Sequence, residues 1–256
     1  MILAFDIGNT HIVMGLYDGL ELAGRWRIDS NPERTVDDYG HLVLSILQRA
    51  GADSKVDGVV IGSVVPTLTY VFEKLGRRYF EVEPVLISGD TELGIVYDVD
   101  APASSIGADR IANAVAVRER YATDCIVVDM GTATTFDLIS ADGTYHGGVI
   151  SPGISTSAES LISRASMLSR VKIEAPPKVI GRDTISMMQS GIFYGAICQI
   201  DGLVERLKAE WGKPCRVIAT GGFVTMLAKF SREFDTVDPN LTLDGLRLSY
   251  QIVTGH

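Results

Sequence analysis

An aspartate followed two residues later by a glycine occurs twice in this chain, each time between two apolar segments. The first copy is Asp6-Ile7-Gly8-Asn9-Thr10 and the second is Asp129-Met130-Gly131-Thr132. Glycine lets backbone N–H groups approach an anion, a hydroxyl can donate to that anion, and a carboxylate can hold a cation beside it. One such triplet is usually an ordinary turn. Two copies with matching flanks favour a pair of loops that bind the phosphates of a nucleotide.

A carboxylate and a guanidinium adjoin in the run Gly107-Ala108-Asp109-Arg110, where a helix is expected to begin. A carboxylate beside a hydroxyl can orient it and take its proton, and a planar guanidinium can bind a substrate carboxylate with two parallel hydrogen bonds. Asp109 can equally cap the helix, and Arg110 can form a surface ion pair. Together with the two loops, the run favours phosphoryl transfer, which depends mainly on positioning and charge neutralisation.

Each Asp-X-Gly turn is predicted to lie at the tip of a β-hairpin. Strand-like apolar segments at 1–5 and 12–17 flank the first turn, and segments at 125–128 and 136–139 flank the second. Both second strands then reach a turn signal. The repeated pattern predicts that the chain contains two copies of one structural unit.

Strands and helices alternate along the rest of the chain, which favours mixed sheets covered by helices. Predicted helices span 35–50, 68–79, 107–121, 184–211 and 243–253, and further predicted strands span 58–62, 84–87, 144–150 and 216–220. No low-complexity linker separates the two halves. We therefore expect two domains, 1–122 and 123–256, with an active site in the cleft between them.

The composition is that of a compact chain rather than a nucleic-acid or membrane protein. With 256 residues, 46% of them hydrophobic and 21% charged, the chain can bury the cores of two domains. A net charge of -9 argues against a nucleic-acid surface, which needs clustered Lys and Arg. No apolar run has membrane-spanning length and no signal peptide is recognisable, so we expect a cytoplasmic location and no membrane partner.

Several residues that can do chemistry are interpreted as structural. Three widely spaced cysteines predict reduced thiols, and four scattered histidines show no metal-ligand spacing, although His11 lies beside the first turn. Asp137 and Asp142 are expected to be solvated turn carboxylates. Met187 and Met188 are expected to pack in the core.

Five segments together resemble the type III pantothenate kinases, in order over nearly the whole chain. They are residues 6–10, 107–114, 129–132, 147–153 and 181–191. The resemblance implies two tandem ribonuclease H-like (actin-like) domains. It also implies ATP-dependent phosphorylation of pantothenate, the first step of coenzyme A synthesis.

The resemblance implies roles for individual residues as well. The nucleotide contacts are Thr132 and the first phosphate loop, namely Asp6, Ile7, Gly8, Asn9, Thr10, His11, Ile12 and Val13. The pantothenate contacts are Gly107, Ala108, Asp109, Arg110 and Thr184, and Asp109 is the general base. Asp129 ligates a monovalent cation (K⁺ or NH₄⁺). Asp6, which directly follows an apolar strand, is expected to contact Mg²⁺ through water or a phosphate of ATP. A homodimer is also implied, and the apolar segment 192–197 fits either a core or a subunit interface.

The segment before Gly107 is longer than the family pattern. An aromatic pantothenate contact is expected there, but counting from Gly94 places Val99, not Tyr97, at that position, and the contact stays unassigned. The turn Thr220-Gly221-Gly222 fits either contact with the adenosine half of a nucleotide or a plain tight turn.

Other function classes are less consistent with the sequence. No Gly-X4-Gly-Lys-Ser/Thr loop and no protein-kinase motif set is present. Sugar and acetate kinases share the duplicated turn but lack the context of Gly107 to Arg110. A regulatory or transcription-accessory role is the alternative from a different class, and the intact Asp6, Asp109, Arg110 and Asp129 argue against it.

Overall fold

The computed structural model describes residues 1–52, 56–164 and 171–255. Contacts divide the chain into two compact units, which are described separately. Unit 1 comprises Met1–Ala122, Gly143–Tyr145 and the C-terminal segment from Asn240, and unit 2 comprises Thr123–Asp142 and His146–Pro239. The C-terminal helix therefore groups with the N-terminal residues. The expected division into 1–122 and 123–256 assigns this helix to the second domain.

Unit 1 is built on a mixed five-stranded sheet with β1 at its centre. The order is β3-β2-β1-β4-β5, with β2 antiparallel and β4 parallel to β1. The strands are β1 (Ile2–Ile7), β2 (His11–Asp18), β3 (Glu21–Asp29), β4 (Gly58–Ser63) and β5 (Val85–Ile87). The predicted first hairpin is confirmed, with Ile7 opposite Ile12 at its tip.

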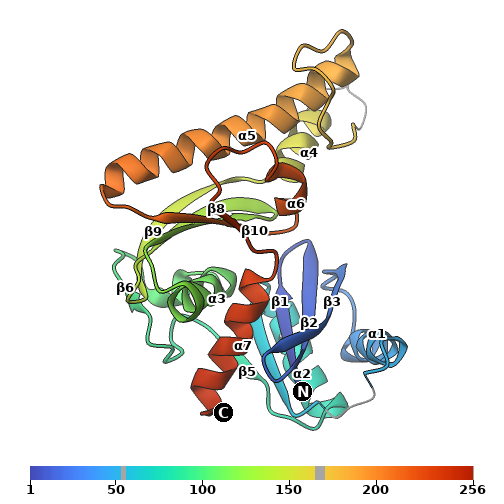
Figure 1. The fold of residues 1–256 in the computed structure, drawn as a ribbon. Helices are drawn as coiled ribbons and strands as arrows, with labels where there is room; N and C mark the ends of the chain where they lie inside the picture. Colours follow the sequence, from blue (N-terminus) through green and yellow to red (C-terminus); the bar gives the residue numbers. More distant parts are fainter. Residues whose placement is uncertain (53–55, 165–170, 256) are drawn as a thin grey trace. The chain divides into compact units, whose positions relative to one another are not determined.

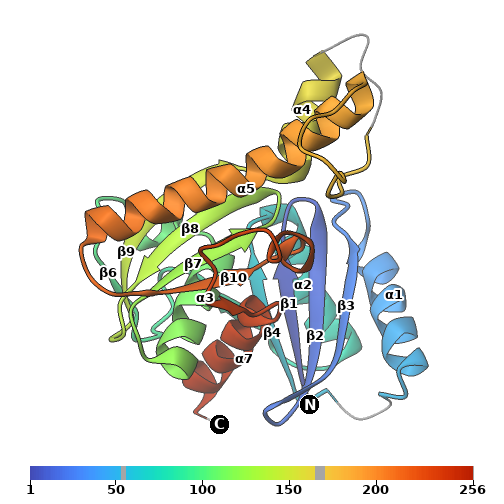
Figure 2. The ribbon, with the colours of Figure 1, turned by 45° about the horizontal axis from the view of Figure 1, so that its top comes forward.

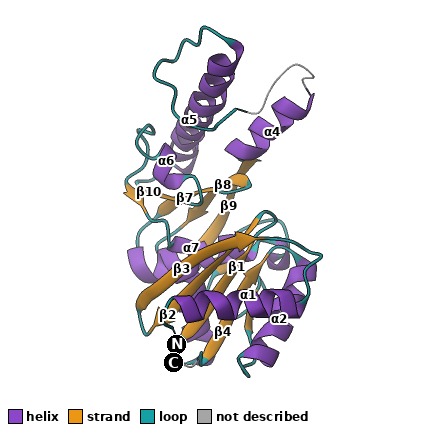
Figure 3. Ribbon diagram, turned by 90° about the vertical axis from the view of Figure 1, so that its right-hand side faces the viewer, coloured by secondary structure: helices purple, strands orange, loops and turns teal. Residues whose placement is uncertain are grey.

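Helices cover both faces of this sheet (Figure 3). The helices of unit 1 are α1 (Val36–Arg49), α2 (Pro66–Tyr79), α3 (Ala108–Ala116) and α7 (Leu241–Thr254), with a short 3-10 turn (η1, Ala103–Ser105). Alternate residues of β1, such as Phe5, pack into a core with Tyr39 of α1 and Phe72 of α2. The other face carries glycines of the sheet against α7, as where Gly62 meets Leu246. Small residues on one face and large ones on the other therefore set which helices lie where.

The helix predicted from 107 to 121 is confirmed, but its last part is not α-helical. A π-helical turn (η2, Val117–Tyr121) continues α3, and Ala122 ends it with a left-handed φ of 47°. Arg118 of this turn donates a hydrogen bond to the carbonyl of Leu93. The turn thus ties α3 to the loop that follows β5.

Unit 2 repeats the strand arrangement of unit 1 around β7. The order of this sheet is β11-β10-β7-β8-β9-β6, of which β6 and the start of β9 belong to unit 1, with β8 antiparallel and β10 parallel to β7. The strands are β6 (Val96–Tyr97), β7 (Cys125–Met130), β8 (Ala133–Ile139), β9 (Thr144–Pro152), β10 (Arg216–Thr220) and β11 (Thr236–Val237). Strand β6 pairs with Thr144 and Tyr145, the part of β9 that belongs to unit 1. The second predicted hairpin is also confirmed.

A 28-residue helix, α5 (Thr184–Trp211), runs across the sheet of unit 2 (Figure 1). Asp183 begins it with a capping box to Ser186, and Gly212 ends it with a φ of 69°. Its apolar residues, among them Phe193 and Val204, pack on β7 in one core. Two shorter helices, α4 (Ile154–Arg164) and α6 (Val224–Leu227), complete the unit.

Two sequence-based interpretations are wrong. Asp137 is fully buried within β8, not solvated in a turn, and accepts a hydrogen bond from the Thr135 hydroxyl at 3.1 Å. Met187 is 56% exposed, whereas Met188 is buried as expected. Both errors arise because a strand or helix residue is assigned to a face by its tertiary neighbours, which a short sequence window does not contain.

Gly245 of α7 sets how closely α7 approaches α3. An ideal Cβ at this position would lie 1.9 Å from the Ala112 carbonyl oxygen. We expect Gly245→Ala to lower the free energy of unfolding by about 1–3 kcal/mol, since the backbone of α3 must move. Denaturant unfolding measures this.

The matched control is Gly202→Ala in α5, where the nearest atom within 4 Å is the flexible end of Arg206. Replacing a helical glycine there is expected to be neutral or stabilising by up to about 1 kcal/mol. Equal stabilities of the two variants would contradict the close α3–α7 contact.

Candidate active site

The first loop is closed by its own backbone and exposes polar residues. The Gly8 N–H donates to the His11 carbonyl at 3.0 Å, while Asn9, Thr10 and His11 are exposed. The side chains of Ile7 and Ile12 are buried in the core of unit 1. These two isoleucines can therefore meet a nucleotide only through their backbone atoms, while their side chains anchor the loop.

Asp6 lies on the opposite face of β1 from that core. Its register partner on β4 is Gly62, and an ideal Cβ at Gly62 would lie 3.5 Å from Cβ of Ala108. Because paired residues of neighbouring strands share a face, Asp6 lies on the same face of the unit 1 sheet as the start of α3. Unit 1 thus brings the first loop and the run from Gly107 to Arg110 to one end of its sheet.

Asp109 lies in the first turn of α3, which begins after Gly107. Its Oδ1 accepts the Arg110 N–H at 2.9 Å, as expected for a carboxylate at a helix N-terminus. An ideal Cβ at Gly107 would lie 2.4 Å from this same oxygen. Glycine at 107 therefore leaves the space that the Asp109 carboxylate occupies.

Arg110 stacks on an aromatic ring that the sequence-based reasoning missed. Its guanidinium carbon lies 5.6 Å from the centre of the Tyr145 ring, and the Tyr97 and Tyr145 ring centres are 6.3 Å apart. The Tyr97 hydroxyl is buried and has no hydrogen-bond partner among the described residues. Burial raises the pKa of Tyr97, with a further contribution from the charge of Asp90. Tyr145 is thus the aromatic ring on which Arg110 stacks, and Tyr97 lies beside Tyr145.

Unit 1 contains a cavity of about 460 Å³ at the carboxyl ends of β4 and β5. Gly107 and Ala108 form part of its wall, together with hydroxyl-bearing residues such as Ser63, Thr69 and Ser88. Ligands of open α/β sheets bind at the carboxyl ends of strands. The cavity therefore adjoins the candidate catalytic run on the side where a ligand is expected.

The second loop, in unit 2, is packed more tightly than the first. The Gly131 N–H donates to the Ala133 carbonyl at 2.9 Å, and Thr132 is exposed. Gly221 has a φ of 97°, and an ideal Cβ there would lie 2.5 Å from Oδ1 of Asp129. Only glycine fits this position, so the turn after β10 closes directly over the Asp129 carboxylate.

The carboxylates of Asp6 and Asp129 suit cations that are also bound by the phosphates of a nucleotide. No group of three or more His, Cys, Asp or Glu side chains able to hold a metal occurs among residues 1–52, 56–164 and 171–255. Mg²⁺ in nucleotide sites is typically held by one or two carboxylates together with phosphates, which matches the single carboxylate of Asp6. The Asp129 carboxylate, which the turn at Gly221 covers, supplies oxygen atoms, the ligands that hard cations prefer.

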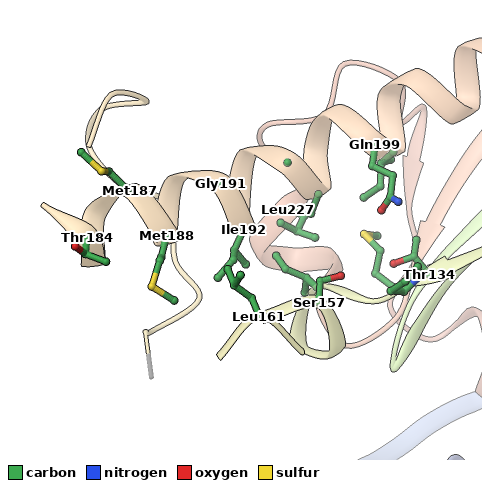
Figure 4. Close-up of a pocket in the computed structure, with 16 residues that line it drawn as sticks. Thr134, Ser157, Leu161, Thr184, Met187, Met188, Gly191, Ile192, Gln199 and Leu227 are labelled. Carbon is green, nitrogen blue, oxygen red and sulfur yellow. The ribbon is translucent and has the colours of Figure 1, made fainter. Parts of the chain in front are cut away.

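Thr184 is the first residue of α5 and is exposed. It lies at the end of an apolar cavity of about 570 Å³ in unit 2, where Met188 and Ile192 of α5 face Leu161 of α4 (Figure 4). Thr184 therefore belongs to unit 2, with Asp129 and Thr132, whereas Gly107 to Arg110 belong to unit 1. Thr184 and the other predicted pantothenate contacts therefore lie in different units.

None of the described helices is long and apolar enough to cross a membrane. Figure 2 shows the β1–β2 hairpin and the neighbouring strand β4 of unit 1.

Comparison with known proteins identifies relatives along the whole chain. The family model of the type III pantothenate kinases matches residues 2–206. A type III pantothenate kinase of Geotalea daltonii is 45% identical over 252 residues, which cover 98% of each chain.

Solved structures share the fold at lower identity. A putative Baf family transcriptional activator from Campylobacter jejuni superposes with a TM-score of 0.60 at 20% identity, covering 99% of this chain and 100% of that one. A ROK family glucokinase from Streptomyces griseus gives 0.51 at 14% identity, covering 98% and 99%. These likenesses concern the fold alone, and the predicted actin-like α/β fold with two mixed sheets flanked by helices is confirmed. By the family match and the identity to its relatives, the chain belongs to the type III pantothenate kinase family.

Proposed function

We propose that this chain transfers the γ-phosphoryl group of ATP to pantothenate, giving ADP and 4'-phosphopantothenate at the first step of coenzyme A synthesis. Family membership supports the substrates. The observation that carries the chemistry is the start of α3, where Gly107 leaves room for the Asp109 carboxylate beside the stacked guanidinium of Arg110. One helix start then presents a proton acceptor and an anion-binding group.

In the proposed reaction, the primary hydroxyl oxygen of pantothenate attacks the γ-phosphorus as the bond to the β–γ bridging oxygen breaks. The Asp109 carboxylate orients the hydroxyl and takes its proton. Arg110 binds the substrate carboxylate with the N–H groups around the edge of its guanidinium, since stacking on Tyr145 occupies only a face. The Tyr97 hydroxyl donates a hydrogen bond to pantothenate.

The nucleotide is held by the two hairpin loops in this proposal. The exposed Asn9, Thr10 and His11, the backbone from Asp6 to Val13, and Thr132 contact the phosphates and sugar. Cations supply charge neutralisation for the phosphoryl oxygens, Mg²⁺ near Asp6 and K⁺ or NH₄⁺ at Asp129. The residues themselves align the two substrates, which is the larger part of catalysis in phosphoryl transfer. Thr184 is proposed as a further pantothenate contact.

The location is proposed to be cytoplasmic and the assembly a homodimer. Apolar side chains are exposed near the cavity of unit 2, namely Leu161, Ile185 and Met187. A second copy that covers them would remove this apolar surface from water. Sedimentation at the mass of one copy would contradict the dimer.

ADP release from ATP, measured with pantothenate and with other small alcohols, tests the function. We expect release with pantothenate, and Asp109→Asn should lower turnover by about 10²–10⁴-fold because the proton acceptor is lost. Its ATP affinity should be preserved. The matched control is Asp18→Asn at the exposed end of β2.

Equal loss of turnover and ATP binding in Asp109→Asn would indicate a structural cap instead of a base. ATP consumption with another alcohol, but not with pantothenate, would contradict the substrate assignment.

Replacing sodium by potassium or ammonium at constant ionic strength is expected to activate the enzyme. Asp129→Asn should remove most of this difference, because the carboxylate that holds the cation is neutralised. Steady-state rates in each salt measure the effect. Full activity of the unmodified chain in sodium alone would contradict the cation site.

Tyr97→Phe is expected to raise the KM for pantothenate about fivefold, the effect of losing one hydrogen bond of about 1 kcal/mol. The KM for ATP should stay unchanged. Tyr194→Phe, which removes a hydroxyl in unit 2 that lies 3.4 Å from the Pro176 carbonyl, is the control. An unchanged pantothenate KM in Tyr97→Phe would show that the hydroxyl does not reach the substrate.

A further inference from the structure

The second loop is held from one side by the start of α4. The carbonyl oxygen of Thr132 accepts two hydrogen bonds from that segment, one from the Gly153 N–H at 3.1 Å and one from the Thr156 hydroxyl at 2.7 Å. The corresponding loop of unit 1 is closed by the hydrogen bond from Gly8 to His11. In unit 2, a side chain of a helix therefore donates a hydrogen bond to a carbonyl of the loop.

The backbone leaves little room for the two segments to shift against each other. An ideal Cβ at Gly153 would lie 2.4 Å from the Gly131 carbonyl oxygen and 2.5 Å from that of Thr132. The chain entering α4 therefore lies directly on the loop backbone. Gly153 binds the Thr132 carbonyl through its backbone N–H, and Thr156 binds the same carbonyl through its side-chain hydroxyl.

One side of the first turns of α4 borders a cavity, although Ile154 belongs to the core of unit 2 and Ala158 is buried. Ile154, Ser157 and Leu161, at helical spacing on the side facing α5, line the apolar cavity of about 570 Å³ (Figure 4). Side chains that border a cavity lack partner atoms on one side and so gain less dispersion energy. The hydrogen bonds on the loop side therefore add to the packing of Ile154 in placing α4 and the loop relative to each other.

Both threonines are exposed, so their hydrogen bond lies at the surface, where a ligand can approach. A hydrogen bond between neutral, exposed groups adds little to global stability. Its removal is expected to change the direction of the loop without unfolding the chain.

We propose that Thr156 is a positioning residue for the nucleotide. Its hydroxyl holds the Thr132 carbonyl, and this keeps the Thr132 hydroxyl and the N–H groups of the loop directed at the phosphates. The inference rests on the proposed function, because it takes Thr132 as a nucleotide contact. Thr156 acts through the loop and touches neither substrate.

Calorimetric titration with a non-hydrolysable ATP analogue tests this role in the full chain. Thr156→Val keeps the shape of the side chain and removes the hydroxyl, so we expect about fivefold weaker binding of the analogue, as for the loss of one hydrogen bond. Thr156→Ser keeps the hydroxyl and should bind within about twofold of the unmodified chain. Ser160→Ala, one turn further along the exposed side of α4, is the matched control and should change nothing.

Two further readouts separate positioning from general damage. The KM for pantothenate and the unfolding midpoint should be unchanged in Thr156→Val. In a double-mutant cycle with Thr132→Val, removing the Thr156 hydroxyl should have a smaller further effect on analogue binding, because one of the groups it directs, the Thr132 hydroxyl, is already absent.

Unchanged analogue binding in Thr156→Val would overturn the proposal, as would fully additive effects in the cycle, which would mean that Thr156 contacts the nucleotide independently. A fall in the unfolding midpoint that Thr156→Ser does not rescue would also overturn it. Failure of the unmodified chain to bind the analogue would instead contradict the proposed function.

Discussion

In each unit, the central strand carries an aspartate where an antiparallel partner and a parallel neighbour meet, and a glycine lies at, or directly after, its register partner on the parallel strand. Asp6 lies beside Gly62 in register, and Asp129 lies beside Thr220, with Gly221 closing over its oxygen. A side chain at Gly62 would meet Leu246 of α7, and one at Gly221 would meet the Asp129 carboxylate and the Met130 backbone. The seating of α7 on the sheet of unit 1 and the turn after β10 in unit 2 therefore both depend on a glycine beside the central strand.

The two units use this common arrangement differently. In unit 1, the face of the sheet that carries Asp6 also receives α3, so the loop adjoins the run that offers Asp109 and Arg110. In unit 2, the corresponding loop is supported by Thr156 and capped by the turn at Gly221. The first arrangement brings a carboxylate and a guanidinium to one helix start, and the second places neighbouring backbone and a helix hydroxyl against the loop that carries a carboxylate and a threonine. The same strand arrangement thus occurs in both units, and the residues after the central strands differ between them.

Local sequence predicted the parts of the fold that depend on neighbouring residues. The two hairpins and the limits of α5 follow from apolar runs, from the Asp183 cap and from Gly212, all of which act within a few residues. Asp137 and Met187 were misassigned, because their burial depends on which elements pack over them. Grouping of α7 with the N-terminal residues depends on Gly245 meeting Ala112, a contact between distant parts of the chain.

Some residues of the candidate site could likewise be found from local sequence, and others could not. Asp6, Asp109, Arg110 and Asp129 could be selected from motifs, since each motif is a continuous run. Tyr97 could not, because the longer segment after Gly94 shifts the count along the sequence, while its pairing with Tyr145 on β9 places it in space. Thr156 gives no sequence signal either, since a threonine in a helix becomes informative only when the carbonyl that it binds is known.

As a pantothenate kinase, the chain transfers a phosphoryl group from ATP to the primary hydroxyl of pantothenate. Identification of the product tests it most directly: the purified chain is incubated with ATP labelled in the γ-phosphate and with pantothenate, and the labelled product is characterised by mass spectrometry and phosphorus NMR. The account predicts one labelled 4'-phosphopantothenate for each ADP formed. Label released only as inorganic phosphate, or carried by a different acceptor while pantothenate stays unmodified, would contradict it.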